Sequence, residues 1–209
     1  IRNFNDSLRV RPIHKDQREF VTKSDLEVHR FLQYKIKEQF PDHNFISEEG
    51  DHIKSGSRYT WVVDPLDGTL NYIIRNPFFS TSIALLEDDQ PIISVIYGPF
   101  NREMFVAVRD RSARLNERNI RMSKERNLNQ SVLSYSYFSR DKHSRQRLLQ
   151  VLGSFEDRTR SMRHLGCMSL ELAYVACGRM EAQVIAPPLR LWDVAAGMLM
   201  VQAAGGKVT

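Results

Sequence analysis

The chain has 209 residues, 42% of them hydrophobic and 26% charged, which is enough apolar material for one globular core or for two small subdomains. No apolar run is as long as a membrane span, and residues 1–10 lack the apolar centre of a signal peptide, so we expect a cytoplasmic protein without membrane contact. The two cysteines, Cys167 and Cys177, are too few for a disulfide framework or a zinc cluster, and we expect both to be buried in an apolar helix.

The first predicted helix covers residues 24–40, where apolar residues recur at helical spacing before Pro41. Ser24 and Glu27 have the spacing of a capping box, and this places Asp25 in the first turn of the helix.

Strands dominate the next part of the chain. The segments 44–47 and 59–63 have the composition of strands, and each runs directly into acidic residues. Three further runs, 79–86, 91–97 and 103–109, are separated by short polar connections and predict an antiparallel meander.

The basic residues that give the chain its net charge of +5 are concentrated in the segment 102–126. Acidic residues alternate with them and no aromatic stacking pattern accompanies them, which is typical of a solvated face, so we expect no nucleic-acid partner. The positive charge would instead help to attract a small phosphorylated substrate.

The rest of the chain predicts a basic helix at 142–152, an apolar helix at 168–177, a strand at 181–186 and a last helix that starts near Trp192 and ends at Gly205 and Gly206. Together these elements predict an α+β layered fold. We expect two subdomains, 1–130 and 131–209, in one compact unit. Because the sequence starts without Met and stops after the strand-like GGKVT, we also expect residues to be missing at both ends.

Acidic residues stand at the ends of several predicted elements. Asp64 and Asp67 are separated by a Pro-Leu pair in an expected turn, a spacing that lets both carboxylates and an intervening carbonyl converge. Glu48 and Asp193 lie at the ends of other elements. Magnesium prefers such oxygen ligands, so the set predicts a magnesium site. Taken singly, each acidic residue is more often a cap or part of a solvated turn.

Gly68 and Thr69 follow Asp67 and are placed to open a helix, whose free N–H groups suit a phosphate oxygen. Metal ions at this point would support a displacement at phosphorus. The string LDGTL also occurs in phosphatases of the haloacid dehalogenase type, whose nucleophile stands two residues before the second Asp. Pro65 occupies that place here, so a covalent aspartyl mechanism lacks its nucleophile.

The whole pattern resembles the inositol monophosphatase family of metal-dependent, lithium-sensitive phosphatases. The resemblance rests on five segments in order: FVTKSD (20–25), FPDHNFISEEG (40–50), WVVDPLDGTLNY (61–72), GCMSLELAYVACGRMEA (166–182) and LRLWDVAAGMLMVQAAGG (189–206). It implies an α/β/α/β/α sandwich with the active site between its two parts, and a homodimer.

The resemblance also implies two or three magnesium ions and their ligands. Glu48, Asp64 and the carbonyl of Leu66 would hold the first ion. Asp64, Asp67 and Asp193 would hold the second. A further ion near Glu48 would supply the attacking water. The choice of Glu48 over the neighbouring Glu49 rests on the resemblance alone.

Further residues receive roles in catalysis and substrate binding from the same resemblance. Thr69, paired with Asp25, would orient and deprotonate the attacking water, and the part of Asp25 rests on the resemblance alone. Gly68 and Thr69 would hold the phosphate through their N–H groups. Gly166, Cys167 and the metal ligand Asp193 would contact the substrate.

Two departures from the family pattern bear on the substrate. Ile185 or Ala186 stands where members that prefer inositol phosphates carry an acidic residue, and Cys167 and Met168 replace small residues. Both departures argue against inositol phosphate as the substrate. Fructose 1,6-bisphosphate, the 2′-phosphate of NADP, 3′-phosphoadenosine 5′-phosphate and histidinol phosphate stay open.

We therefore expect a magnesium-dependent phosphomonoesterase that hydrolyses a small sugar, polyol or nucleotide phosphate by direct attack of a metal-activated water. The alternative is an inactive relative that keeps the fold for regulation, because some members of the family associate with RNA machinery. The complete set of predicted ligands favours the enzyme. His164 and Glu181 are left outside the predicted site, because a lone His and a strand Glu are more often structural.

Overall fold

The computed structural model describes residues 12–14, 20–137 and 142–209. Residues 1–10, where we expect no signal peptide, lie outside this described part. Within it, no helix combines the length and apolar character that crossing a membrane requires.

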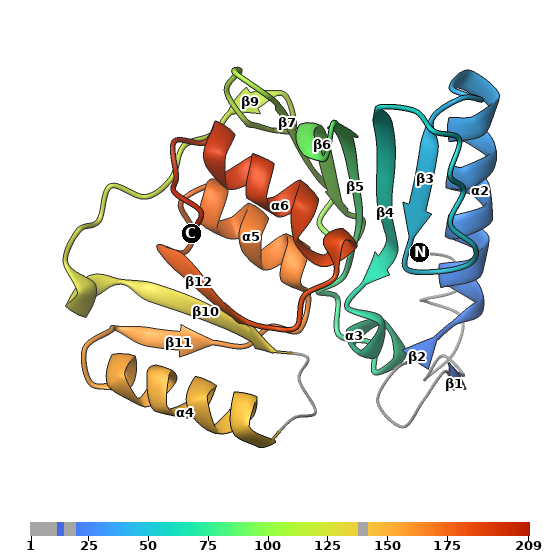
Figure 1. Cartoon of the computed structure of the whole chain (residues 1–209). Coiled ribbons are helices and arrows are strands. Elements are labelled where there is room, and N and C mark those ends of the chain that lie inside the picture. Colours follow the sequence, from blue (N-terminus) through green and yellow to red (C-terminus); the bar gives the residue numbers. More distant parts are fainter. Residues whose placement is uncertain (1–11, 15–19, 138–141) are drawn as a thin grey trace.

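The described elements form the layers of an α/β/α/β/α sandwich (Figure 1). Helix α2 (Lys23–Gln39) covers one face of a seven-stranded sheet. Helices α5 (Met168–Ala176) and α6 (Leu191–Ala203) lie between this sheet and a three-stranded sheet, whose outer face is covered by α4 (Lys142–Glu156). The predicted α+β layered fold is therefore confirmed.

The seven-stranded sheet has the order β3-β4-β5-β6-β7-β8-β9. Its strands are β3 (Asn44–Ser47), β4 (Tyr59–Asp67), β5 (Ser80–Glu87), β6 (Gln90–Gly98), β7 (Glu103–Val108), β8 (Arg114–Leu115) and β9 (Arg118–Asn119). Only β3 and β4 pair in parallel, and the antiparallel order β5-β6-β7 confirms the predicted meander. A separate pair, β1 (Ile13–His14) and β2 (Phe20–Val21), leads into α2.

The start of α2 differs from the sequence prediction. The N-cap is Thr22, whose side chain accepts the N–H of Ser24, and the capping box is closed by Asp25 rather than by Glu27. The expected box of Ser24 and Glu27 is wrong because Thr22 and Asp25 are both buried, so their side chains have no water to replace the bonds they exchange. Asp25 does lie in the first turn, as predicted.

The acidic motif after 59–63 is a strand with an irregularity, not the expected turn. Strand β4 continues through Asp67, and its register with β5 shifts between Asp64 and Asp67. Helix α3 (Thr69–Ile73) then begins directly after Gly68, which confirms the predicted helix start. Gly68 has a φ of 87°, a left-handed conformation that glycine adopts with little cost.

The three-stranded sheet is parallel and has the order β11-β10-β12. Strand β12 (Ala182–Ala186) was predicted, whereas β10 (Val132–Tyr137) and β11 (Ser161–Arg163) were not. Strand β10 follows a short 3-10 turn, Leu128–Gln130, and its sequence VLSYSY has no continuous apolar run. Its two serines are buried and face inward, which only the packed structure reveals.

Helices α5 and α6 share one hydrophobic core with the large sheet, and Gly197 of α6 lies directly against α5. A Cβ at Gly197 would lie 2.2 Å from Cδ1 of Leu172 in α5. The expected placing of both cysteines inside an apolar helix is only partly right, because Cys167 and Cys177 cap the two ends of α5. Cys167 is buried, whereas Cys177 is half-buried.

The space around Gly197 and Gly153 differs, so their substitution by alanine should have opposite effects on stability. Gly197→Ala should lower the free energy of unfolding by about 1–3 kcal/mol, because the methyl group overlaps Leu172 and the core must shift. The matched control, Gly153→Ala in α4, has nothing within 4 Å of the new Cβ and should raise it by up to about 1 kcal/mol. Urea unfolding of the two variants measures both changes, and equal stability of Gly197→Ala and the parent would contradict the packing.

Candidate metal centre

Four carboxylates from distant parts of the sequence lie near one another. Asp64 and Asp67 come from β4, Glu48 follows β3, and Asp193 lies in the first turn of α6. The pKa of Asp64 is raised well above its usual range, first by burial and then by the negative charges of Glu48, Asp67 and Asp193. The structure therefore places the other three predicted carboxylates close enough to Asp64 for their charges to act on it.

Backbone N–H groups orient two of these carboxylates. Asp64 Oδ1 accepts the N–H of Leu66 at 3.0 Å, and Asp193 Oδ2 accepts that of Arg190 at 2.8 Å. The pKa of Asp193 is raised to about 6, chiefly by burial and further by the charge of Asp67, against the opposing effect of the Arg190 N–H. Both side chains are thus fixed in direction while their charged forms are disfavoured.

Asp67 is held by the beginning of α5. Its Oδ2 accepts the N–H of Ser169 at 2.6 Å, the Ser169 hydroxyl at 2.5 Å and the Cys167 thiol at 3.3 Å. The Ser169 hydroxyl lies 2.7 Å from that of Ser80 on β5. Burial raises the pKa of Asp67, although these hydrogen bonds oppose the change. The carboxylate therefore caps a helix that belongs to another part of the chain.

The donors fit magnesium by their chemistry, although they do not form a finished coordination shell. No three His, Cys, Asp or Glu side chains of the described residues are arranged as a group ready to hold a metal ion. Asp64 is only 3% exposed and lies among three other carboxylates, so a nearby cation would favour its ionised form. Hard oxygen donors of this kind suit magnesium rather than a soft metal.

Thr69 lies between two of the predicted site groups. Its hydroxyl is 3.0 Å from the carbonyl oxygen of Leu66 and 3.3 Å from Asp25 Oδ1. Asp25 Oδ2 accepts hydrogen bonds from the N–H and the hydroxyl of Thr22. The pKa of Asp25 is raised by burial, with a further contribution from Glu49, although the bonds to Thr22 oppose it. The expected pairing of Thr69 with Asp25 is thus present in the structure.

The neighbouring Glu48 and Glu49 act on different partners. The charge of Glu48 raises the pKa of Asp64, whereas Glu49, only 4% exposed, adds to the raised pKa of Asp25. This difference supports Glu48 as the residue that faces the carboxylate group, on grounds independent of any resemblance.

The predicted phosphate-binding and substrate-binding residues also meet. A Cβ added to Gly68 would lie 3.1 Å from Cβ of Cys167 and 3.2 Å from the carbonyl oxygen of Gly166. Asn71 of α3 donates to the carbonyl oxygen of Leu165 at 2.7 Å, which ties the two segments together. The sequence did not single out Asn71.

The sequence also missed Ser80, Ser169 and Glu171. Glu171 has no exposed surface, and its Oε1 accepts the N–H groups of Leu165 at 3.2 Å and Gly166 at 3.0 Å. Burial, with the nearby charge of Asp67, raises the pKa of Glu171 to about 7. The only signal for Ser169 and Glu171 was their polarity within an otherwise apolar helical run.

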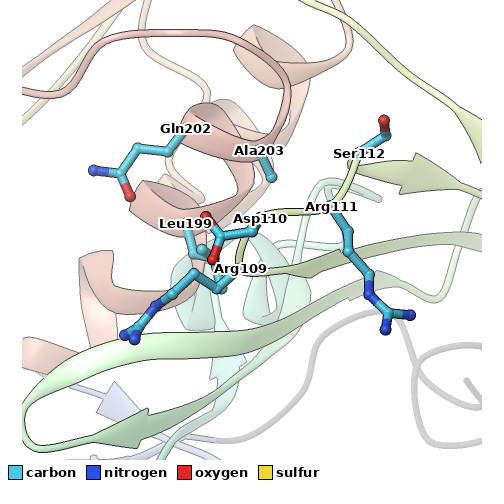
Figure 2. Close-up of a pocket in the computed structure, with 7 residues that line it drawn as sticks. All are labelled: Arg109, Asp110, Arg111, Ser112, Leu199, Gln202 and Ala203. Carbon is cyan, nitrogen blue, oxygen red and sulfur yellow. The ribbon is translucent and has the colours of Figure 1, made fainter.

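Two of the cavities among the described residues are not lined by the four carboxylates, although the first reaches Leu66 beside them. One, of about 470 Å³, is bordered by Ser24, Glu27 and the aromatic rings of Tyr72 and Phe79. The other, of about 430 Å³, lies between the end of β7 and the end of α6, and is shown in Figure 2. In that view the side chain of Arg111 points away from Gln202, so the basic groups do not converge on one ligand.

Comparison with known proteins places this geometry in a family. Residues 2–209 match the model of the inositol monophosphatase family. Among curated relatives, a Nus factor SuhB of Xylella fastidiosa is 36% identical over 208 residues, covering 100% of this chain and 75% of that protein. A Nus factor SuhB of Escherichia coli is 33% identical, covering 100% and 78%.

Solved structures give the same result. The extragenic suppressor protein suhB of Bartonella henselae has a TM-score of 0.89 at 31% identity, covering 98% of this chain and 78% of that one. An inositol monophosphatase of Thermotoga maritima has a TM-score of 0.86 at 33% identity, covering 97% and 77%. On the family match and the identity to these relatives, the chain belongs to the inositol monophosphatase family.

Proposed function

We propose that the protein is a magnesium-dependent phosphomonoesterase. The observation that carries the proposal is the position of Asp64, buried among the carboxylates of Glu48, Asp67 and Asp193. Magnesium bound there would polarise the phosphate and lower the pKa of a coordinated water. Two or three ions, inhibition by lithium and a homodimeric assembly are further parts of the proposal that come from the family resemblance.

The protein's own groups then have separate tasks. Asp64, Asp67, Asp193, Glu48 and the carbonyl of Leu66 would hold the metal ions. Asp67 is positioned for this by Ser169, and Asp193 by the Arg190 N–H.

Thr69 and Asp25 would manage the proton of the attacking water. The Thr69 hydroxyl, bonded to Asp25, is placed to accept a hydrogen bond from this water and to pass a proton toward the buried carboxylate. Burial raises the pKa of Asp25, which makes its carboxylate a stronger base than an exposed Asp.

The phosphate would lie at Gly68 and at the start of α3, where free N–H groups face it. Because helix α3 is short, we assign the phosphate to the metal ions first and to these N–H groups second. The opposite wall is the segment Leu165–Cys167, which Glu171 and Asn71 hold in place.

A second candidate function is favoured by the basic surface and by the names of the relatives. The curated relatives are named Nus factor SuhB. In this chain Arg102, Arg111, Arg114, Arg118 and Arg121 are all exposed. A regulatory role in a complex that contains RNA would use this surface. Two results together would favour this role over the phosphatase: no hydrolysis of any phosphomonoester at any magnesium concentration, and binding of RNA that weakens as the salt concentration rises.

The first prediction concerns the metal ligand Asp67. Asp67→Asn should lower magnesium-dependent phosphate release from glycerol 2-phosphate by about 100-fold or more, because one charged ligand is lost. The free energy of unfolding without magnesium should change little, since one like charge fewer relieves repulsion in the cluster.

The stabilisation of the protein by bound magnesium gives a second measurement on the same variant. At 100 times its dissociation constant, magnesium should raise the free energy of unfolding of the parent by about 2.7 kcal/mol, and that of Asp67→Asn much less. Asp110→Asn, which removes an exposed carboxylate in the cavity of Figure 2, should behave like the parent in both assays. Full turnover by Asp67→Asn would show that the metal site lies elsewhere.

The raised pKa of Glu171 predicts a pH-dependent stability. Its pKa rises from 4.5 in the unfolded chain to about 7 in the folded protein, so its stabilising contribution is complete below pH 4.5 and is lost as the pH rises through about 7. Glu171→Gln should remove this contribution to the pH dependence of the free energy of unfolding. The contribution amounts to at most about 3 kcal/mol between pH 4.5 and about pH 7.

The measurement is urea unfolding at a series of pH values between 4.5 and 7.5. Glu156→Gln at the exposed end of α4 controls for the loss of one negative charge. If Glu171→Gln keeps the slope of the parent, Glu171 is not the group that carries a proton in the folded core.

A further inference from the structure

The loop that follows β3 carries Glu48 and turns back on its own strand. Ile53 exchanges two backbone hydrogen bonds with Phe45 of β3, at 2.9 and 2.8 Å. One residue earlier, Nε2 of His52 lies 3.2 Å from the carbonyl oxygen of Ser47. Nε2 is the donor in this bond, because a carbonyl oxygen only accepts. The loop is therefore tied to the strand from which it starts.

Helix α2 blocks movement of this loop in one direction. Gly50 has a φ of 78°, and a Cβ added to it would lie 2.6 Å from Nε2 of His29. His29 lies on α2, is only 6% exposed, and its Nδ1 lies 3.0 Å from the hydroxyl oxygen of Ser47. Because the buried ring of His29 occupies the space beside Gly50, a displacement of the loop has to go away from α2.

The exposed side chain of His52 connects this loop to the start of α6. Its ring meets the ring of Trp192 edge to face, with centroids 5.9 Å apart and an angle of 72° between the ring planes. Trp192 lies in the first turn of α6 and packs against the main core. The next residue is the proposed metal ligand Asp193. The ring contact therefore joins a loop that carries one proposed ligand to a helix that carries another.

The two proposed ligands on either side of this contact repel each other. Glu48 and Asp193 both lie close enough to Asp64 for their charges to act on it. Without a cation, this repulsion favours a wider separation of the loop and the helix. An edge-to-face pair of aromatic rings is attractive and opposes that separation. The contact of His52 with Trp192 is thus placed where it keeps the carboxylates close.

We propose that His52 is a positioning residue of the metal centre, which holds the loop of Glu48 against the start of α6 through its ring contact with Trp192. This inference rests on the proposed phosphatase function and adds a residue outside the proposed ligand set. A site that is already assembled binds its ion more tightly, because less ordering remains to be done on binding. His52 should therefore raise the affinity for magnesium without taking part in the reaction.

Magnesium binding to variants of His52 separates the ring contact from the hydrogen bond. In titration calorimetry, His52→Ala should raise the apparent dissociation constant of magnesium by about fivefold, the scale of one aromatic pair. His52→Phe keeps a ring and should stay within about twofold of the parent, whereas His52→Gln keeps a donor without a ring and should resemble His52→Ala. His143→Ala removes an exposed histidine on α4 and should bind magnesium like the parent.

A double-mutant cycle shows whether His52 acts through Trp192. Trp192→Leu should also weaken magnesium binding, and adding His52→Ala to it should cause little further loss, because the ring contact is already gone. A further loss of about fivefold in the double variant would overturn the inference, since His52 would then act on the site by another route.

Kinetics distinguish positioning from a part in the reaction. With glycerol 2-phosphate, His52→Ala should need about fivefold more magnesium for half of its maximal rate, while kcat at saturating magnesium stays within about twofold of the parent. A kcat that stays low at saturating magnesium would overturn the positioning role.

The binding data also separate this inference from the proposed function. Equal magnesium affinity of the parent and His52→Ala would overturn this inference alone and leave the phosphatase intact. Weaker binding by the variant of a protein that hydrolyses no phosphomonoester would support the role of His52 and refute the phosphatase. A parent that binds no magnesium would overturn both.

Discussion

The burial of Asp64 beside three other carboxylates is the interaction on which the candidate site depends. Like charges at this depth raise the free energy of the folded chain unless they are neutralised by protons or by a cation. The folded chain remains stable because the carboxylates are attached to different elements, and each of these elements is stabilised by packing contacts away from the carboxylates. Asp64 and Asp67 belong to β4, a strand of the large sheet that is paired on both sides, and Asp193 belongs to a helix that packs in the main core. The candidate site is therefore locally unfavourable for folding and is held in place by the surrounding sheets and helices.

The hydrogen bonds around Asp67 show how the two sheets are coupled. Asp67 lies on β4 of the large sheet, and its partner Ser169 lies at the beginning of α5, the helix that packs on β12 of the small sheet. Since the side chain of Cys167 provides no cap of its own for α5, the carboxylate takes that position. The same bond therefore orients a proposed metal ligand and joins the two layers of the molecule.

Asp67 is bonded to one end of a short segment, residues 164–168, and at the other end the ring of His164 stacks on that of Tyr135 in the small sheet. One end is shaped by the ring of His164 and the other by Cys167, with Gly166 between them. This segment therefore joins the candidate metal centre to the edge of the small sheet.

The sequence by itself determined the layered α+β class, the meander, the main helices and the four carboxylates, because these depend on local periodicity and on short motifs. It gave the wrong capping box for α2 and missed β10 and β11, because buried serines and a buried Asp25 acquire their partners only when distant segments pack. The sequence did not single out Glu171, and it left His164 outside the predicted site. Only the tertiary structure showed that the charge of Glu48 acts on Asp64 and that of Glu49 on Asp25, and that two tyrosines of β10 meet the histidine that follows β11, since spatial neighbours across parallel strands leave no pattern in the sequence.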